Sequence, residues 1–186
     1  TDWNSIRLIT IVLFISRIQY TVHFGSMKQM VEDIDPMMKE DSAFYGYITS
    51  LNNLGVAISG PVFGLLANKY GFRNPTLLAY CIAFCCNFGV IFLFNITSNG
   101  RYFALVIRFF AGISAGGSSI LNTYWASVCA SQDARTGSTY TEAAMTLGMV
   151  FGPLIQMLCI QIPNDIIIFH FLYINKYTVP AMIAIV

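Results

Sequence analysis

The sequence predicts an all-α, multi-pass membrane protein, because it is apolar, poor in charge and divided into long hydrophobic runs. Of its 186 residues, 56% are hydrophobic and only 10% are charged. A soluble domain carries about 25% charged residues, so this chain lacks the charge to cover a water-facing surface. Ten basic and nine acidic residues leave a net charge of +1, which provides no basic field for nucleic acid. The lipid bilayer is the expected partner, and nucleic acid is not.

Apolar runs of about 20 residues, the length that crosses a bilayer, divide the chain into five predicted spans and one incomplete span. The complete spans cover about 8–27, 44–67, 75–94, 102–128 and 138–162, and the incomplete one covers 178–186. The first run has no Ala-x-Ala-like cleavage site after it, which favours a retained helix over a signal peptide. The last run reaches only about 13 Å at helical rise, so we expect a truncated sixth helix and a fragment of a longer protein.

Most of the charges fall between the spans. Residues 28–42 hold five acidic side chains and the helix-breaking pair Asp35-Pro36, and they predict a wet loop. Residues 166–174 are apolar but short, and are expected at the membrane interface or against the bundle. Basic residues are divided equally between the two sides, so the positive-inside rule gives no orientation. The sequon at Asn95 lies on the non-cytoplasmic side if the N-terminus is cytoplasmic.

The stretch 60–73 combines a small-residue helix face with a tight, basic turn. Gly60 and Gly64 are four residues apart, a spacing that allows a neighbouring helix to approach closely. Gly71 permits the turn, and Lys69 and Arg73 are placed to anchor it among lipid headgroups. An ordinary packed helix followed by a positively charged loop explains the same residues.

This stretch resembles the loop between helices two and three of the major facilitator superfamily, which reads G-x-L-x-D-R-x-G-R-[RK]. The positions that match in place or in charge are Gly64, Leu66, Lys69, Gly71 and Arg73. Two positions depart from the pattern, because Asn68 replaces the acidic residue and Phe72 replaces an arginine. The resemblance assigns a gating role to this loop.

Two further stretches resemble the same superfamily, in the correct order and spacing. One is Arg108-x-x-x-Gly112-x-x-x-Gly116, which is similar to the fourth-helix motif. The other is Gly148-x-x-x-Gly152-Pro153, which is similar to the fifth-helix packing element. The resemblance implies that residues 1–186 are the N-terminal six-helix half of a twelve-helix carrier. It also implies that helices one and four line a cavity, while helices two and five contact the missing C-terminal half.

Three short patterns resemble a lysosomal branch of the superfamily, the one connected with neuronal ceroid lipofuscinosis. They are Ile34-Asp35-Pro36, Gly64-x-x-x-Asn68 and the run from Ile174 to Pro180. This resemblance implies a lysosomal or endosomal membrane and a role in organelle chloride conductance.

Arg108 is the sharpest candidate for a substrate or ion site. It lies about six residues, or roughly 9 Å, into its span, where an arginine costs about 2.5–3.5 kcal/mol on insertion scales. It should therefore face protein or a wet cavity. Small and polar residues recur from it at spacings of three and four on one helix face, at Gly112, Ala115, Ser119, Asn122 and Ala126. We interpret this face as a site for an anion or substrate carboxylate; a snorkelling arginine held by loop carbonyls is the alternative.

The other cavity candidates are Arg17, His23, Asn52 and Asn53. His23 is able to titrate near neutral pH and relay a proton, and a histidine facing the membrane interface is an equal alternative. The two asparagines are expected as hydrogen-bond partners between helices or as ligands. Glu142 lies near the cytoplasmic end of its helix, where contact with Lys69 or Arg73 would form a gate.

An enzyme, a cofactor and a metal site are not expected. Residues 112–116 spell G-x-S-x-G, but the hydrolase motif requires a preceding strand and Asp/His partners, and an apolar helical run precedes it here. The five cysteines lack metal-binding or disulfide spacing. The sequence predicts transmembrane transport of a small solute or anion by alternating access or in a channel-like mode, and the resemblance to the lysosomal branch implies chloride as a cargo. The alternative is a non-transporting interaction or scaffold protein, or a half-transporter that dimerises.

Overall fold

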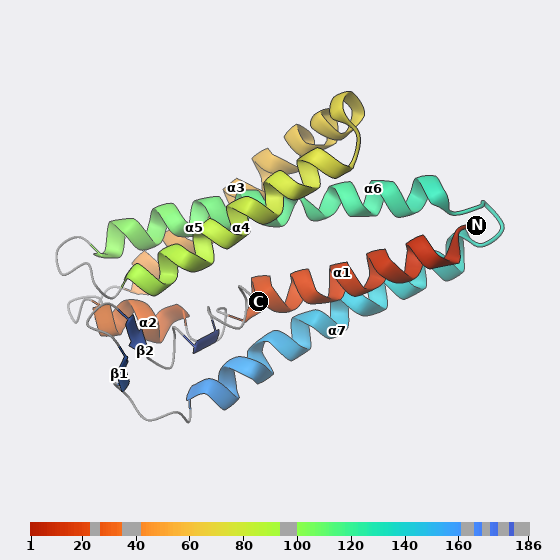
Figure 1. The fold of residues 1–186 in the computed structure, drawn as a ribbon. Coiled ribbons are helices and arrows are strands. Elements are labelled where there is room, and N and C mark those ends of the chain that lie inside the picture. Colours follow the sequence, from red (N-terminus) through yellow and green to blue (C-terminus); the bar gives the residue numbers. More distant parts are fainter. Residues whose placement is uncertain are drawn as a thin grey trace.

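Long helices dominate the fold. The structure is a computed structural model, and it describes residues 1–22, 27–34, 42–93, 100–160, 166–168, 172–174 and 179–180. The helices are α1 (Trp3–Thr21), α2 (Met27–Ile34), α3 (Ser42–Tyr70), α4 (Arg73–Leu93), α5 (Gly100–Gly116), α6 (Ser118–Val128) and α7 (Ala134–Ile160). Two short strands follow, β1 (Ile166–Ile168) and β2 (Leu172–Ile174). The long helices lie side by side as a bundle (Figure 1). The expected all-α membrane fold is confirmed, with one small hairpin added to it.

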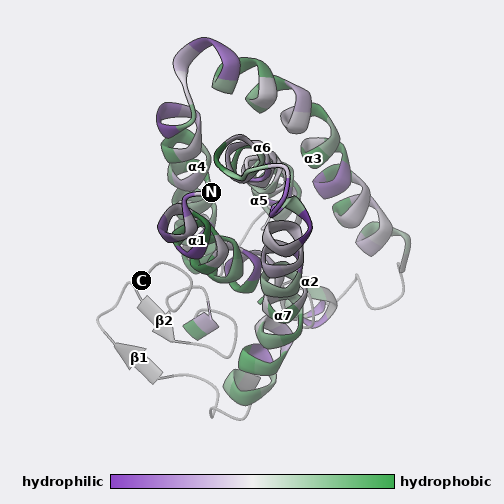
Figure 2. Cartoon of the chain, turned by 90° about the vertical axis from the view of Figure 1, so that its right-hand side faces the viewer, coloured by the Kyte–Doolittle hydropathy of each residue, from purple (hydrophilic) through white to green (hydrophobic). Residues whose placement is uncertain are grey.

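Four stretches of helix in the described ranges are long and apolar enough to cross a membrane. They are Ala43–Tyr70, Arg73–Ile91, Tyr102–Val128 and Ala134–Cys159, and they overlap the second to fifth predicted spans. The third of them joins α5 and α6. The first predicted span corresponds to α1, which contains Arg7 and Arg17 and does not meet the same hydropathy criterion. Figure 2 shows hydrophobic residues along the helices and hydrophilic ones at the turn between α3 and α4.

Two segments differ from their predicted structure. Part of the predicted wet loop is α2, a short helix that buries Met27 and Met30; the methionines lie three residues apart and therefore share a helix face. The apolar run at 166–174 contains an antiparallel pairing in which Ile166 lies opposite Ile174, since β-branched residues favour strands. His23, the Asn95 sequon and all but two residues of the predicted span 178–186 lie outside the described residues.

A glycine contact joins α3 to α5. Gly112 lies directly against the backbone carbonyl of Asn52, and Gly116 lies against Ser59, with no room for a Cβ atom at either glycine. Gly55 of α3 makes the reciprocal approach to α5. Because these contacts advance along both helices together, α3 and α5 run parallel.

Gly60 and Gly64 do not point into a helix contact within the described chain, although the backbone nitrogen of Gly60 lies 3.1 Å from the Cβ position of Gly116. A Cβ atom at either position would meet open space. Residue Ser59 faces α5, and each following residue is turned about 100° further round the helix. The face that α3 turns toward α5 is therefore the one that carries Asn52, Gly55 and Ser59.

A second glycine contact joins α1 to α7. Gly148 lies against Arg17, and Gly152 lies against Thr21, again with no room for a Cβ atom. This is the packing expected of the fifth-helix element. Pro153, the last residue of that element, is exposed inside α7 and does not take part in the contact.

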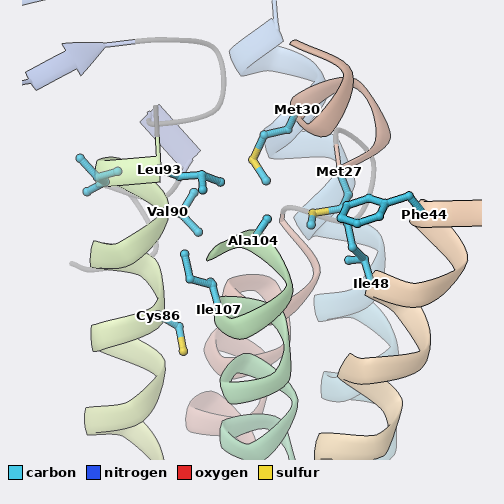
Figure 3. Packing of buried hydrophobic residues seen from close by; sticks show 10 residues of the cluster. Met27, Met30, Phe44, Ile48, Cys86, Val90, Leu93, Ala104 and Ile107 are labelled. Carbon is cyan, nitrogen blue, oxygen red and sulfur yellow. The ribbon is translucent and has the colours of Figure 1, made fainter. Parts of the chain in front are cut away.

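A buried hydrophobic cluster fills the end of the bundle at which α2 lies. Figure 3 shows the side chains of α2, α3, α4 and α5 that form it, namely Met27, Met30, Phe44, Ile48, Cys86, Val90, Leu93, Ala104 and Ile107. The α2 methionines pack between α3 and the ends of α4 and α5, so α2 covers this end of the bundle. Cys86, Val90 and Ile107 also border the cavity described next.

Candidate functional site

A cavity lies between α1, α4, α5 and the start of α6. Its volume is about 70 Å³, which accommodates several water molecules. Polar side chains line it from four helices, among them Arg17 and Tyr20 of α1, Asn87 of α4, Arg108 of α5 and Ser118 of α6. Both cationic groups are arginines, and the described lining contains no Asp or Glu. The cavity is therefore electropositive.

Arg108 is the buried cation of this cavity. Only 6% of its surface is exposed, and its Nε and Nη2 atoms have no hydrogen-bond partner among the described residues. No loop carbonyl of the described chain accepts a bond from it, so snorkelling does not account for its position here. A buried guanidinium without a partner is costly, and a site that keeps one is suited to receive an anion from the cavity.

Arg17 is the second cation, and its guanidinium is partly satisfied. Its Nη2 donates to Ser118 Oγ at 3.3 Å and to Met145 Sδ at 3.5 Å, while its Nε is buried without a partner. The close approach of Gly148 places Arg17 at the junction of α1, α6 and α7. Arg17 therefore ties three helices together while it contributes charge to the cavity.

The predicted polar stripe along the fourth span is interrupted by a helix break at Gly117. The Gly117 N–H donates to the Ser114 carbonyl at 2.9 Å, a shortened turn between α5 and α6. The cavity wall follows the face formed by Ile107, Ala111, Ser114 and Ser118, which recur at spacings of three and four, and Ala115 and Gly117 flank this face. A side chain at Gly117 would overlap Ala79 of α4, so only glycine fits at this position.

Ser119 and Asn122 do not line the described cavity as predicted. Ser119 Oγ donates to the Gly116 carbonyl of its own helix at 2.8 Å. Asn122 is half-buried, with its Oδ1 atom unpaired within the described chain. Ser119 lies one position further round the helix than Ser118, and Asn122 lies one turn beyond Ser118, past the last lining residue of α6.

A second, smaller cavity of about 20 Å³ lies beside the first, and Arg108 lines both. Its other lining residues are Met27, Tyr45, Ile48, Thr49 and Asn52. Asn52 is 3% exposed; its Nδ2 donates to Tyr20 Oη at 2.6 Å, while its Oδ1 has no partner in the described chain. Asn53 is exposed and lines neither cavity.

The turn between α3 and α4 has the geometry that Gly71 predicts. Gly71 has φ of 77°, in the left-handed region that favours glycine. Lys69 lies over the Tyr70 ring at 5.3 Å, and Asn68 and Arg73 are exposed. The turn is therefore a polar, cationic cap on one end of the bundle.

Phe72, which departs from the family pattern, packs inward. Its ring centroid lies 5.1 Å from that of Tyr124 on α6. At the position where the family motif has an arginine, this chain thus has a phenylalanine that makes an aromatic contact between the turn and α6. Glu142 is exposed, and the described chain contains no ion pair between it and Lys69 or Arg73. The expected gate contact is absent from this conformation because α7 packs on α1, whereas α3 packs on α5.

Several cavity residues were not predicted. Asn87 is 7% exposed and donates from Nδ2 to the Ala83 carbonyl at 3.0 Å; a buried amide within an apolar run is the same signal that identified Arg108. Tyr20 and Tyr80 carry a weaker signal, since tyrosine is common at membrane interfaces. Cys86 carries none, because a cysteine in an apolar run ordinarily behaves as a small hydrophobe.

Comparisons with known proteins agree with this arrangement. A family model described as Major Facilitator Superfamily matches residues 9–175. The chain is also similar to major facilitator superfamily domain-containing protein 8 of Xenopus laevis, with 24% identity over 182 residues, which cover 97% of this chain and 35% of the relative. The chain thus spans about a third of the length of that relative. No solved structure matches it. With the family match extending over most of its length, the chain belongs to the Major Facilitator Superfamily of membrane transporters.

Proposed function

We propose that this chain supplies the substrate-binding cavity of a carrier that moves a small anion across a membrane. The observation that carries the proposal is Arg108, a buried guanidinium whose Nε and Nη2 atoms have no partner among the described residues, in a cavity whose described lining contains no carboxylate. An anion that enters the cavity supplies the missing hydrogen bonds and the opposite charge. Charge-assisted bonds of this kind are about twice as strong as neutral ones.

The arrangement of helices supports transport by alternating access or in a channel-like mode. Substrate sites in such carriers lie near the midplane, between two halves of the fold. The outer faces of α3 and α7 are apolar and exposed, with Leu65 at 71% and Leu158 at 68%, and they suit either lipid or the C-terminal half of a complete carrier. The proposal also names chloride as a cargo and a lysosomal or endosomal membrane as the location. The resemblance of residues 34–36 and 64–68 to the lysosomal branch supports both.

The test is anion uptake by the full-length protein in proteoliposomes, with radiolabelled chloride and glycolate as probes. Arg108→Ala should abolish uptake of the transported anion while expression and elution on size exclusion remain normal. Arg7→Ala is the matched control, because Arg7 is an exposed cation of α1 outside the cavity, and it should leave uptake unchanged. Arg108-independent uptake, or no uptake of any anion, would overturn the proposal.

A second candidate is a half-transporter that dimerises, or a membrane scaffold that does not transport. It is favoured by Gly60 and Gly64, which leave open space on α3 of the kind that a neighbouring helix fills. Disulfide cross-linking of Gly64→Cys between two copies in membranes would support it. A strictly monomeric and inactive product would count against a dimeric carrier.

A further inference from the structure

Asn52 and Arg108 line the same small cavity, and each has buried hydrogen-bonding atoms without a partner among the described residues. On the basis of the proposed anion transport, we propose that these two residues recognise a small hydroxycarboxylate, with its carboxylate on Arg108 and its hydroxyl on Asn52. The packing of the described helices leaves the Oδ1 atom of Asn52 and the Nε and Nη2 atoms of Arg108 without hydrogen bonds. The proposal therefore concerns which anion the cavity prefers.

Asn52 offers an acceptor. Its Nδ2 donates to Tyr20 Oη at 2.6 Å, and this bond orients the amide. Its Oδ1 is buried and has no partner among the described residues. Thr49, another residue of the cavity wall, donates its hydroxyl to the Tyr45 carbonyl at 3.0 Å, so its proton is already used.

Arg108 offers only donors, because a guanidinium has N–H groups and no acceptor. Its Nε and Nη2 atoms are free in the described chain. A halide satisfies Arg108 but leaves the Asn52 oxygen unpaired, since a halide cannot donate a hydrogen bond. A ligand with an anionic oxygen and an adjacent O–H satisfies both residues. An analogue of this ligand without the O–H leaves the Asn52 oxygen buried and unpaired, and sites of this kind discriminate strongly against such an analogue.

The sizes of the two cavities orient such a ligand. The smaller cavity, about 20 Å³, holds only one or two water-sized groups. Met27 and Ile48 form its apolar side, and Figure 3 shows them beside Phe44 at the edge of the hydrophobic cluster. The hydroxyl therefore fits in the smaller cavity and the carboxylate at Arg108. The remainder of the ligand extends into the larger cavity, which Arg108 also lines.

The experiment compares glycolate with acetate, which share a carboxylate and differ by one hydroxyl. Binding of each is measured by isothermal titration calorimetry on the purified full-length protein, at constant ionic strength and with chloride as a third probe. Glycolate should bind about tenfold more tightly than acetate, the effect of leaving one buried acceptor unpaired. Equal affinities for glycolate and acetate would overturn the proposal.

Substitutions assign the preference to Asn52. Asn52→Leu removes the acceptor at similar volume and should reduce the glycolate-to-acetate ratio to about one while acetate still binds. Asn52→Ala serves the same purpose if the leucine variant does not fold. Asn53→Leu, at the exposed neighbouring position, is the matched control and should keep the wild-type ratio. A ratio that survives loss of the Asn52 amide would overturn the role of Asn52.

The outcomes also separate this inference from the proposed function. If chloride and acetate are transported in an Arg108-dependent way without any preference for glycolate, anion transport stands and hydroxycarboxylate recognition fails. If no anion shows Arg108-dependent binding or uptake, both fail.

Discussion

Gly112 of α5 lies directly against the backbone carbonyl oxygen of Asn52 on α3, with no space for a methyl group between them. Arg108 lies one helical turn before Gly112 and so shares its face of α5. The close approach of the two backbones is what allows Arg108 and Asn52 to border one small cavity. The packing motif and the candidate site are therefore parts of a single arrangement.

Gly112→Ala should destabilise the bundle and impair anion binding together. The added methyl group forces α3 and α5 apart, and overpacking of this kind costs about 1–3 kcal/mol. Thermal unfolding in detergent measures the first effect, and calorimetry with anions measures the second. Gly64→Ala is the control, because its Cβ atom meets open space; it should leave both properties close to wild type. Equal behaviour of the two variants would contradict the close contact.

Gly71→Ala should destabilise the turn between α3 and α4. The φ of 77° at this residue costs an L-amino acid with a Cβ atom about 1–2 kcal/mol. Gly71→Asn should cost less, since asparagine tolerates the left-handed region. The comparison is made by thermal unfolding of both variants. A larger loss for asparagine than for alanine would show that backbone conformation does not determine the choice of residue.

Cys86 should report the charge of the cavity. Its side chain lines the same cavity as Arg108, so a thiol reagent that reaches it passes through the field of both arginines. In a full-length variant that retains only this cysteine, an anionic methanethiosulfonate should react about tenfold faster than a cationic one of similar size. Arg108→Gln should reduce the difference between the two rates, and Arg17 should maintain the remaining preference for the anionic reagent. A preference for the cationic reagent would show that the cavity is not electropositive.

The first turn of α1 should loosen in acid. Ser5 Oγ donates to Asp2 Oδ2 at 2.6 Å, and this bond, followed by the bond from the Ser5 amide, lowers the pKa of Asp2 from that of an ordinary aspartate. A carboxylate with a lowered pKa stabilises the folded state at higher pH, and its contribution is lost as the pH falls through the pKa of the folded state.

Hydrogen–deuterium exchange of the N-terminal peptide tests this expectation. Asp2→Asn is the matched control, because asparagine also caps helices but does not titrate here. The wild type should exchange no faster than the variant at about pH 5, and faster than it at about pH 3, on either side of the ordinary aspartate pKa. A difference between the two proteins that does not change with pH would rule out the Asp2 carboxylate as the titrating cap.

Sequence patterns were sufficient where one residue type has few structural alternatives. Gly71 at a tight turn and the glycines at 112, 116, 148 and 152 take the conformations and contacts that their spacing predicts. Arg108 lies in a cavity wall, as the cost of placing an arginine in lipid requires. In each case local chemistry alone excludes most other environments.

Patterns were insufficient where a neighbouring helix decides the outcome. The stripe from Arg108 to Asn122 was drawn from one helix alone, whereas the cavity follows the face of Ile107, Ala111, Ser114 and Ser118 and does not include Ser119 or Asn122. Asn52 and Asn53 are identical in type and adjacent, and only the position of α5 determines which one is buried. Such distinctions depend on the rotation of one helix against another, which spacing along a single chain does not encode.

The two glycine contacts join four of the helices into an α1–α7 pair and an α3–α5 pair, and the larger cavity lies between α1 of the first pair and α5 of the second, with α4 and the start of α6 completing its wall. Arg17 belongs to the first pair and Arg108 to the second. A glide of one pair past the other would therefore change the separation of the two positive charges while each glycine contact stayed intact. The same residues that make the bundle rigid within each pair leave the electrostatics of the cavity adjustable between them.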